Sequence, residues 1–122
     1  MTLNRLMLSL AAALLLLAPA FAADFAGKWT AAIDTQIGVQ NYTYDLKVEG
    51  TKVTGTAKSQ NGESQIQDGA IKGDEITFVE NLDFQGQSLK ITYTGKIAGD
   101  EIKFNRKVAD FASEDFVAKR AK

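Results

Sequence analysis

The 122-residue chain contains no cysteine and no histidine. Without cysteine, a disulfide framework is excluded, so a small domain must depend on its hydrophobic core and its hydrogen-bonded sheet. Without histidine, the Ser-His and Cys-His nucleophile systems are excluded, and so are the usual zinc and copper ligand sets. An enzyme built from this chain would therefore have to use carboxylate, tyrosine or lysine side chains.

The chain also lacks an excess of charge of either sign, with 14 basic and 15 acidic side chains and a net charge of −1. Nucleic acids and anionic membrane surfaces are bound by clustered Lys and Arg residues. We therefore expect neither partner. Nothing in the sequence indicates a cofactor, and we expect none.

The longest apolar run lies at the N-terminus and is typical of a signal peptide. Arg5 precedes an apolar run from Leu6 to Leu17, and a small-residue cleavage site ends at Ala22. The run is shorter than the roughly 20 residues of a membrane-spanning helix. We expect residues 1–22 to be removed, which leaves 122 − 22 = 100 residues, 23–122, as one domain. This predicts a secreted or periplasmic protein with no membrane span after cleavage.

Proline is almost absent, with one residue at position 19, and glycines recur at regular intervals afterwards. Short segments of alternating apolar and polar residues lie between these glycines, and no segment has a helical period. The pattern predicts an all-β fold, an eight-stranded antiparallel up-and-down barrel, in which closure leaves no unpaired edge. The expected strands are 27–35, 40–49, 52–59, 64–72, 75–82, 87–98, 101–108 and 114–121.

Two segments, 71–82 and 97–108, have nearly the same sequence, IKGDEITFVENL and IAGDEIKFNRKV. Each places a Gly-Asp pair between two alternating runs, which is typical of a two-residue hairpin turn. A third, weaker copy has Gly50-Thr51 at its turn. We expect these hairpins to close one end of the barrel with three β-branched pairs: Ile71 with Ile76, Ile97 with Ile102, and Val48 with Val53.

The next inward positions of the same hairpins combine a large side chain with a glycine. Large and small residues that alternate in this way fit the interior of a narrow barrel. We expect Phe78, Phe104 and Phe116 in the core. The predicted pairs are Leu46 with Gly55, Gly69 with Phe78, and Gly95 with Phe104.

One strand requires an irregularity. Asn61-Gly62 is a strong hairpin signal and would place Ala57 opposite Ile66. Ile66 and Ile71 are five residues apart, so they cannot share a face of a regular strand. We therefore predict a β-bulge near Asp68-Gly69.

The first strand contains Gly27-Lys28-Trp29, which resembles the G-x-W signature of the calycin barrels, the lipocalins and avidins. The resemblance implies an eight-stranded up-and-down barrel in which a late Arg covers the Trp at the closed end, here Arg120 over Trp29. The chain departs from full-size lipocalins, because no helix is expected on either side of the barrel. Val53-Thr54-Gly55-Thr56 is similar to an avidin strand, but with a single tryptophan a biotin site is not implied. Through its GDEIKF segment at 99–104 and its VAKR segment at 117–120, the chain also resembles short secreted bacterial domains of unassigned role, some of them associated with polysaccharide-degrading proteins.

The third inward layer is polar and lies toward the end with the longer connections. The predicted facing pairs are Tyr44 with Ala57, Gln67 with Glu80, and Tyr93 with Arg106. We expect Glu80 and Arg106 to pair, since an isolated buried charge costs several kcal/mol. The layer is either an internal ion pair or the polar anchor of a ligand cavity. Its candidate ligand-binding residues are Glu80, Arg106, Tyr44, Tyr93, Tyr42 and Gln67.

Two further chemistries are considered for the acidic residues. Five of them gather near the loops of that end, but their spacing matches no calcium loop, so we expect a solvated surface and no metal site. A glycosidase would need a second carboxylate about 5 to 9 Å from Glu80, and Asp68 is the candidate. The five acidic residues are Asp34, Asp83, Asp110, Glu114 and Asp115.

The sequence thus predicts a non-catalytic protein that binds a small ligand or a glycan fragment at the polar, open end of the barrel. One alternative is a minimal carbohydrate-active hydrolase that uses Glu80. Another is a structural or interaction module whose barrel is packed throughout. The ligand, the oligomeric state and the choice among these alternatives are left open by the sequence.

Overall fold

The computed structural model describes residues 24–121, so the expected signal peptide lies outside the described residues. Within them the chain forms strands and turns and no helix, and hence no helix that could cross a membrane. Each strand contains the alternating residues that predicted it. The strands are β1 (Gly27–Thr35), β2 (Gly38–Glu49), β3 (Lys52–Ser59), β4 (Gly62–Lys72), β5 (Glu75–Phe84), β6 (Gln87–Ala98), β7 (Glu101–Val108) and β8 (Ala112–Arg120).

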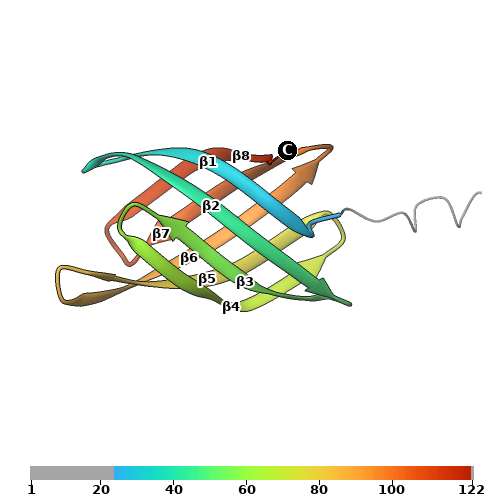
Figure 1. Ribbon diagram of the computed structural model, residues 1–122, viewed down its shortest axis with the longest axis horizontal. Helices are drawn as coiled ribbons and strands as arrows, with labels where there is room; N and C mark the ends of the chain where they lie inside the picture. Colours follow the sequence, from blue (N-terminus) through green and yellow to red (C-terminus); the bar gives the residue numbers. More distant parts are fainter. Residues whose placement is uncertain (1–23, 122) are drawn as a thin grey trace, which may run out of the picture.

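Every strand pairs antiparallel with the next, and β8 returns to β1 to close the barrel. Figure 1 shows the strands winding obliquely around a common axis. The predicted all-β, eight-stranded up-and-down barrel is confirmed. The closing seam is short, because the paired positions of β1 and β8 are Trp29 with Arg120 and Thr30 with Lys119.

The three glycine turns have the predicted registers, with Ile71 opposite Ile76, Ile97 opposite Ile102, and Val48 opposite Val53. Only one residue of each pair is fully buried, however, and Val48 is 37% exposed. These pairs stand at the rim of the barrel, where Ile71 and Ile97 are half-buried against the core. They do not close this end by themselves.

The end is completed by the segment before β1, to which the sequence pattern gave no structural role. Phe25 is buried, and its carbonyl accepts a hydrogen bond of 2.9 Å from the Trp29 indole. The Arg120 guanidinium lies over the Trp29 ring at 4.3 Å and donates to the carbonyls of Asp24 and Ala26. Arg120 therefore holds this segment across the closed end by a cation–π contact and two hydrogen bonds.

The predicted bulge is present in β4. Asp68 has a φ of +54°, and the pairing of β4 with β5 shifts between Gln67 and Ala70. The two residues of the bulge, Asp68 and Gly69, lie opposite Phe78, between the pairs of Gln67 with Val79 and Ala70 with Thr77. On its other side Gly69 pairs with Val53 of β3, where an added Cβ would be 2.2 Å from the Val53 carbonyl oxygen.

The hairpin between β3 and β4 turns one residue earlier than predicted. Gly62 pairs with Ser59, so the loop consists of Gln60 and Asn61, and Ala57 faces Ser64 rather than Ile66. The Gln60 side chain explains the shift, since it bonds the main chain of β2 at Asn41 and Val39. Contact with a neighbouring strand has therefore displaced the turn from its local preference.

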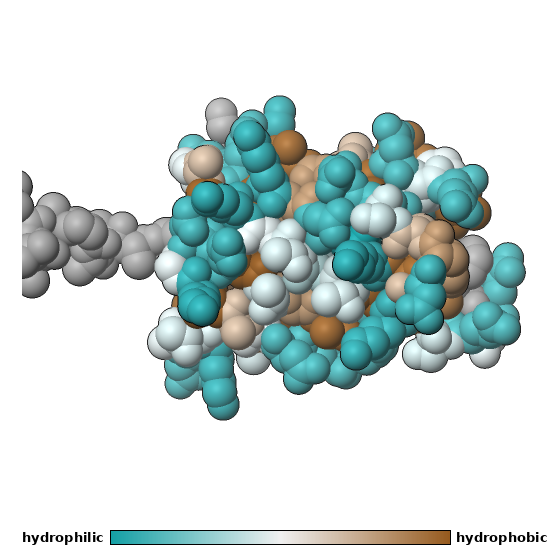
Figure 2. Space-filling model, turned by 180° about the vertical axis from the view of Figure 1, so that it is seen from behind, coloured by the Kyte–Doolittle hydropathy of each residue, from teal (hydrophilic) through white to brown (hydrophobic). Residues whose placement is uncertain are grey.

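Five aromatic rings fill the middle of the barrel. Phe78 and Tyr93 stack at 4.4 Å between ring centroids, and Phe104 stacks on Phe116 at 5.3 Å. Tyr44 packs against these four rings. Figure 2 shows that hydrophilic side chains cover much of the face of the barrel seen there. The aromatic layer makes the middle of the barrel a packed core, so any free space must lie beyond it.

Candidate ligand site at the open end

A cavity of about 160 Å³ lies at the end of the barrel opposite Trp29 and Arg120. The turns after β1, β3 and β7 each contribute at least one side chain to it, and its wall is mainly apolar. Ile37 and Phe111 lie at the mouth and are 61% and 62% exposed. The apolar side chains that line it are Ile37, Leu82, Leu89, Ile91, Val108, Phe111 and Ala112.

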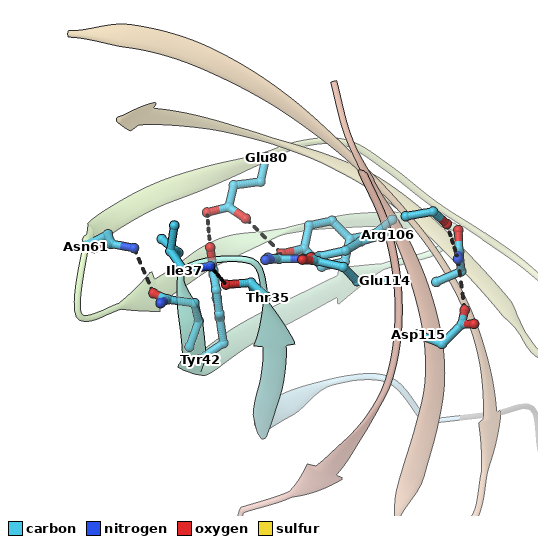
Figure 3. Close-up of polar contacts among 12 residues, drawn as sticks. Thr35, Ile37, Tyr42, Asn61, Glu80, Arg106, Glu114 and Asp115 are labelled. Carbon is cyan, nitrogen blue, oxygen red and sulfur yellow. Dashed lines mark hydrogen bonds and ion pairs between the residues drawn. The ribbon is translucent and has the colours of Figure 1, made fainter. Parts of the chain in front are cut away.

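Polar side chains form the inner end of the cavity. Tyr42 and Arg106 both line it, and the Arg106 guanidinium lies 5.1 Å from the centre of the Tyr42 ring. Arg106 Nε donates to Glu114 Oε1 at 2.6 Å, and Arg106 Nη1 donates to the Tyr93 hydroxyl at 3.1 Å. Figure 3 shows Arg106 and Glu114 side by side. A cation with its own counterion is thus held where apolar walls meet the packed core.

Glu80 lies beneath this floor rather than in the cavity. Its carboxylate is 1% exposed and accepts hydrogen bonds from Tyr93, at 2.8 Å, and from Tyr42, at 3.3 Å (Figure 3). The Tyr93 hydroxyl donates to Glu80 and accepts bonds from Arg106 and Tyr44. Glu80 and Arg106 are therefore linked through a tyrosine, and the expected direct ion pair between them is wrong.

The strand pairing explains which carboxylate Arg106 meets. Arg106 and Glu114 are directly opposite each other on β7 and β8, whereas β6 separates β7 from Glu80 on β5. Glu114 also shares an inward face with Phe116 and Ala118. The sequence analysis placed Glu114 in an acidic rim, although this alternation along β8 was a signal that could have found it.

Burial changes the protonation of the network. Burial raises the pKa of Glu80 above its usual range, and hydrogen bonds from Tyr93 and the charge of Arg106 offset part of that rise. Burial likewise raises the pKa of Tyr44 and Tyr93 well above the ordinary value, so both stay neutral donors. Burial alone would lower the pKa of Arg106, but the contacts with Tyr93 and Glu114 outweigh burial and raise the pKa above its usual value. Arg106 therefore stays charged.

The other predicted site residues lie in three places. Tyr42 lines the cavity, whereas Tyr44 lies in the packed core, away from it. Gln67 points outward and accepts a hydrogen bond from Asn81 at 3.0 Å, so its predicted place beside Glu80 is wrong, because the bulge puts Ile66 there instead. Asp68 is exposed and offers Glu80 no second carboxylate.

The five acidic residues that were expected together near the loops of the open end do not all face solvent. Asp34, Asp83, Asp110 and Asp115 are exposed, while Glu114 is turned inward. Among residues 24–121, no group of three acidic side chains is close enough to hold a metal ion.

One polar contact at the mouth had no signal in the sequence. Gln40 is 7% exposed and lines the cavity, and its Oε1 accepts a hydrogen bond of 2.8 Å from Asn61 Nδ2. Together with the bonds of Gln60 to the main chain of β2, it ties the β3–β4 turn to the neighbouring wall. These amide hydrogen bonds fix the β3–β4 turn against β2 at the mouth of the cavity.

Comparison with known proteins adds one structural likeness. No family model and no curated protein matches the chain. A crystal structure of a variant of the fluorescent protein UnaG is similar to it, with a TM-score of 0.49 and 14% sequence identity. The likeness covers 80% of this chain and 96% of that one.

Proposed function

We propose that this protein binds a small, mainly apolar molecule in the cavity at the open end of its barrel. The observation that carries the proposal is the cavity itself, an apolar wall that ends on Tyr42 and Arg106. Ligand sites are typically concave and apolar, with a few polar groups that fix the ligand's orientation. In another protein, an apolar cavity of roughly 150 Å³ holds one benzene molecule. A volume of about 160 Å³ therefore suits a single ring or a short chain.

A glycan fragment is supported less well. Sugar rings carry hydroxyl groups on every side, and burying these without hydrogen bonds is costly. Seven of the fourteen lining residues are apolar, and apolar atoms form most of the exposed wall. Among the functions considered, an apolar ligand fits this wall best, and the secreted or periplasmic location stays a proposal from the N-terminal sequence.

The hydrolase alternative gains no support. A glycosidase needs two carboxyl groups that flank the substrate. Glu80 lies under the floor and does not line the cavity, and Asp68 is exposed. The packed-module alternative describes the aromatic middle of the barrel, but not its open end.

The test is thermal denaturation with toluene, phenol, indole, cyclohexanol and glucose. A ligand at ten times its Kd adds about 1.4 kcal/mol to the stability, which raises the Tm of a 100-residue domain by roughly 6–11 °C. Val108→Phe fills the cavity and should abolish the shift. Val117→Phe makes the same change on the outer face of β8, where the residue is 39% exposed, and should preserve it. The proposal fails if no ring compound raises the Tm, or if both variants respond alike.

A further inference from the structure

The cavity presents one cation and one anion, and they neutralise each other. Among the described lining residues, Arg106 and Glu114 are the charged ones. Their atoms lie 2.6 Å apart, and their side chains are 5% and 12% exposed. Water screens such a pair only weakly, so a charged group that enters beside it interacts strongly with each of the two charges.

An anionic ligand would find no net positive charge at this floor, because Glu114 already balances Arg106. To reach Arg106, its carboxylate would have to approach Glu114, which already occupies the guanidinium Nε. Like charges held together in a poorly solvated site repel each other strongly. The cation is therefore a poor anchor for an anion.

A neutral acceptor has no such difficulty. A guanidinium carries five N–H groups, and the bonds to Glu114 and Tyr93 use two of them. Arg106 lines the cavity, so its remaining donors can serve an uncharged carbonyl or hydroxyl oxygen there. Apolar walls hold the rest of such a molecule.

We propose that the cavity selects an uncharged, ring-sized molecule with one hydrogen-bond acceptor, and that Glu114 is the residue that excludes the matching carboxylate. This inference rests on the proposed function of the cavity and names its ligand class. Glu114 acts by occupying Arg106 and by adding its own negative charge.

The test compares three ligands of nearly equal size by isothermal titration at neutral pH: benzamide, benzoate and toluene. The protein should bind benzamide at least about tenfold more tightly than benzoate, and more tightly than toluene, which has no acceptor. Glu114→Gln frees the cation and should reduce the preference for benzamide over benzoate by about tenfold or reverse it.

Asp115→Asn is the matched control. It also removes one negative charge from β8, but Asp115 is exposed and accepts from Asn105 at 2.9 Å on the outer face, away from Glu114 (Figure 3). The preference for benzamide should persist in this variant. An equal change in both variants would show a general charge effect and overturn the role of Glu114.

Further outcomes separate this inference from the proposed function. Benzoate bound as tightly as benzamide overturns the inference and leaves the proposed function standing, whereas no binding of any ring compound overturns both. If circular dichroism shows that Glu114→Gln does not fold, Arg106→Met combined with Glu114→Gln removes both partners of the ion pair together. That double variant should bind benzamide no better than toluene, and a persisting preference for benzamide overturns the inference.

Discussion

The ion pair between Arg106 and Glu114 is the polar contact whose loss should destabilise the barrel most. An exposed ion pair contributes about 0–1 kcal/mol, but breaking a buried one from one side costs about 3–5 kcal/mol. This pair is 5% and 12% exposed, which places it in the second class. Arg106 keeps the Tyr93 hydroxyl and the Tyr42 ring, so we expect Glu114→Gln to cost about 3 kcal/mol, the lower end of that range.

Double-mutant cycles separate the two carboxylates that share Arg106. Combining Glu114→Gln with Arg106→Met should give a coupling energy of about 2 kcal/mol, because these side chains touch. Combining Glu80→Gln with Arg106→Met should give about 0.5–1 kcal/mol, because the Tyr93 hydroxyl lies between them.

Urea unfolding at neutral pH measures these energies. With an m-value of about 1 kcal/mol/M, a cost of about 3 kcal/mol moves the midpoint by about 3 M. Circular dichroism reports the transition, and m must stay constant among the variants. Equal coupling of the two carboxylates to Arg106, or a coupling to Glu114 below about 0.5 kcal/mol, would refute the reasoning.

Two further predictions concern Glu80 and the glycines. Burial raises the pKa of Glu80, so the folded state keeps a proton that the unfolded chain releases near pH 4.3. The free energy of unfolding therefore falls as the pH rises from the unfolded-state pKa of Glu80 to its higher folded-state pKa. Glu80→Gln should therefore gain stability relative to the unaltered protein as the pH rises above the unfolded-state pKa of about 4.3, and a constant difference in urea midpoints would contradict this. Gly55→Ala would place a Cβ 1.8 Å from the Asp45 carbonyl oxygen and should cost more than about 3 kcal/mol, or prevent folding, by the same assay. Gly50→Ala meets no atom within 4 Å and should cost about 1 kcal/mol for its positive φ, so equal losses would show that the close approach at Gly55 does not matter.

Most of the barrel was predictable from the sequence, because strand alternation and turn residues are local signals. The glycine turns set three registers correctly, and the five-residue spacing of Ile66 and Ile71 required the bulge that Asp68 forms. The predicted strands differ from the observed ones by up to two residues at their ends. The β3–β4 turn was misplaced because Gln60 bonds β2, a contact between segments that no local pattern contains.

The site was predicted less completely, because it depends on which side chains meet. Alternation correctly placed Glu80, Arg106, Tyr42 and Tyr93 inside the barrel. It did not show that Glu114 would reach Arg106, or that the bulge would turn Gln67 outward. Both outcomes depend on side-chain reach and on the exact position of one extra residue.

The sequence by itself determined the all-β barrel, its hairpin order and the inward face of most strands, since these depend on residues close together along the chain. The calycin resemblance placed Arg120 over Trp29, but the tertiary structure alone decided that Phe25 covers this end and that Tyr44 and Tyr93 join the expected phenylalanines in the middle. It also decided that about 160 Å³ stays open above Arg106. Free volume is what remains after all side chains have packed, so no local pattern can specify it.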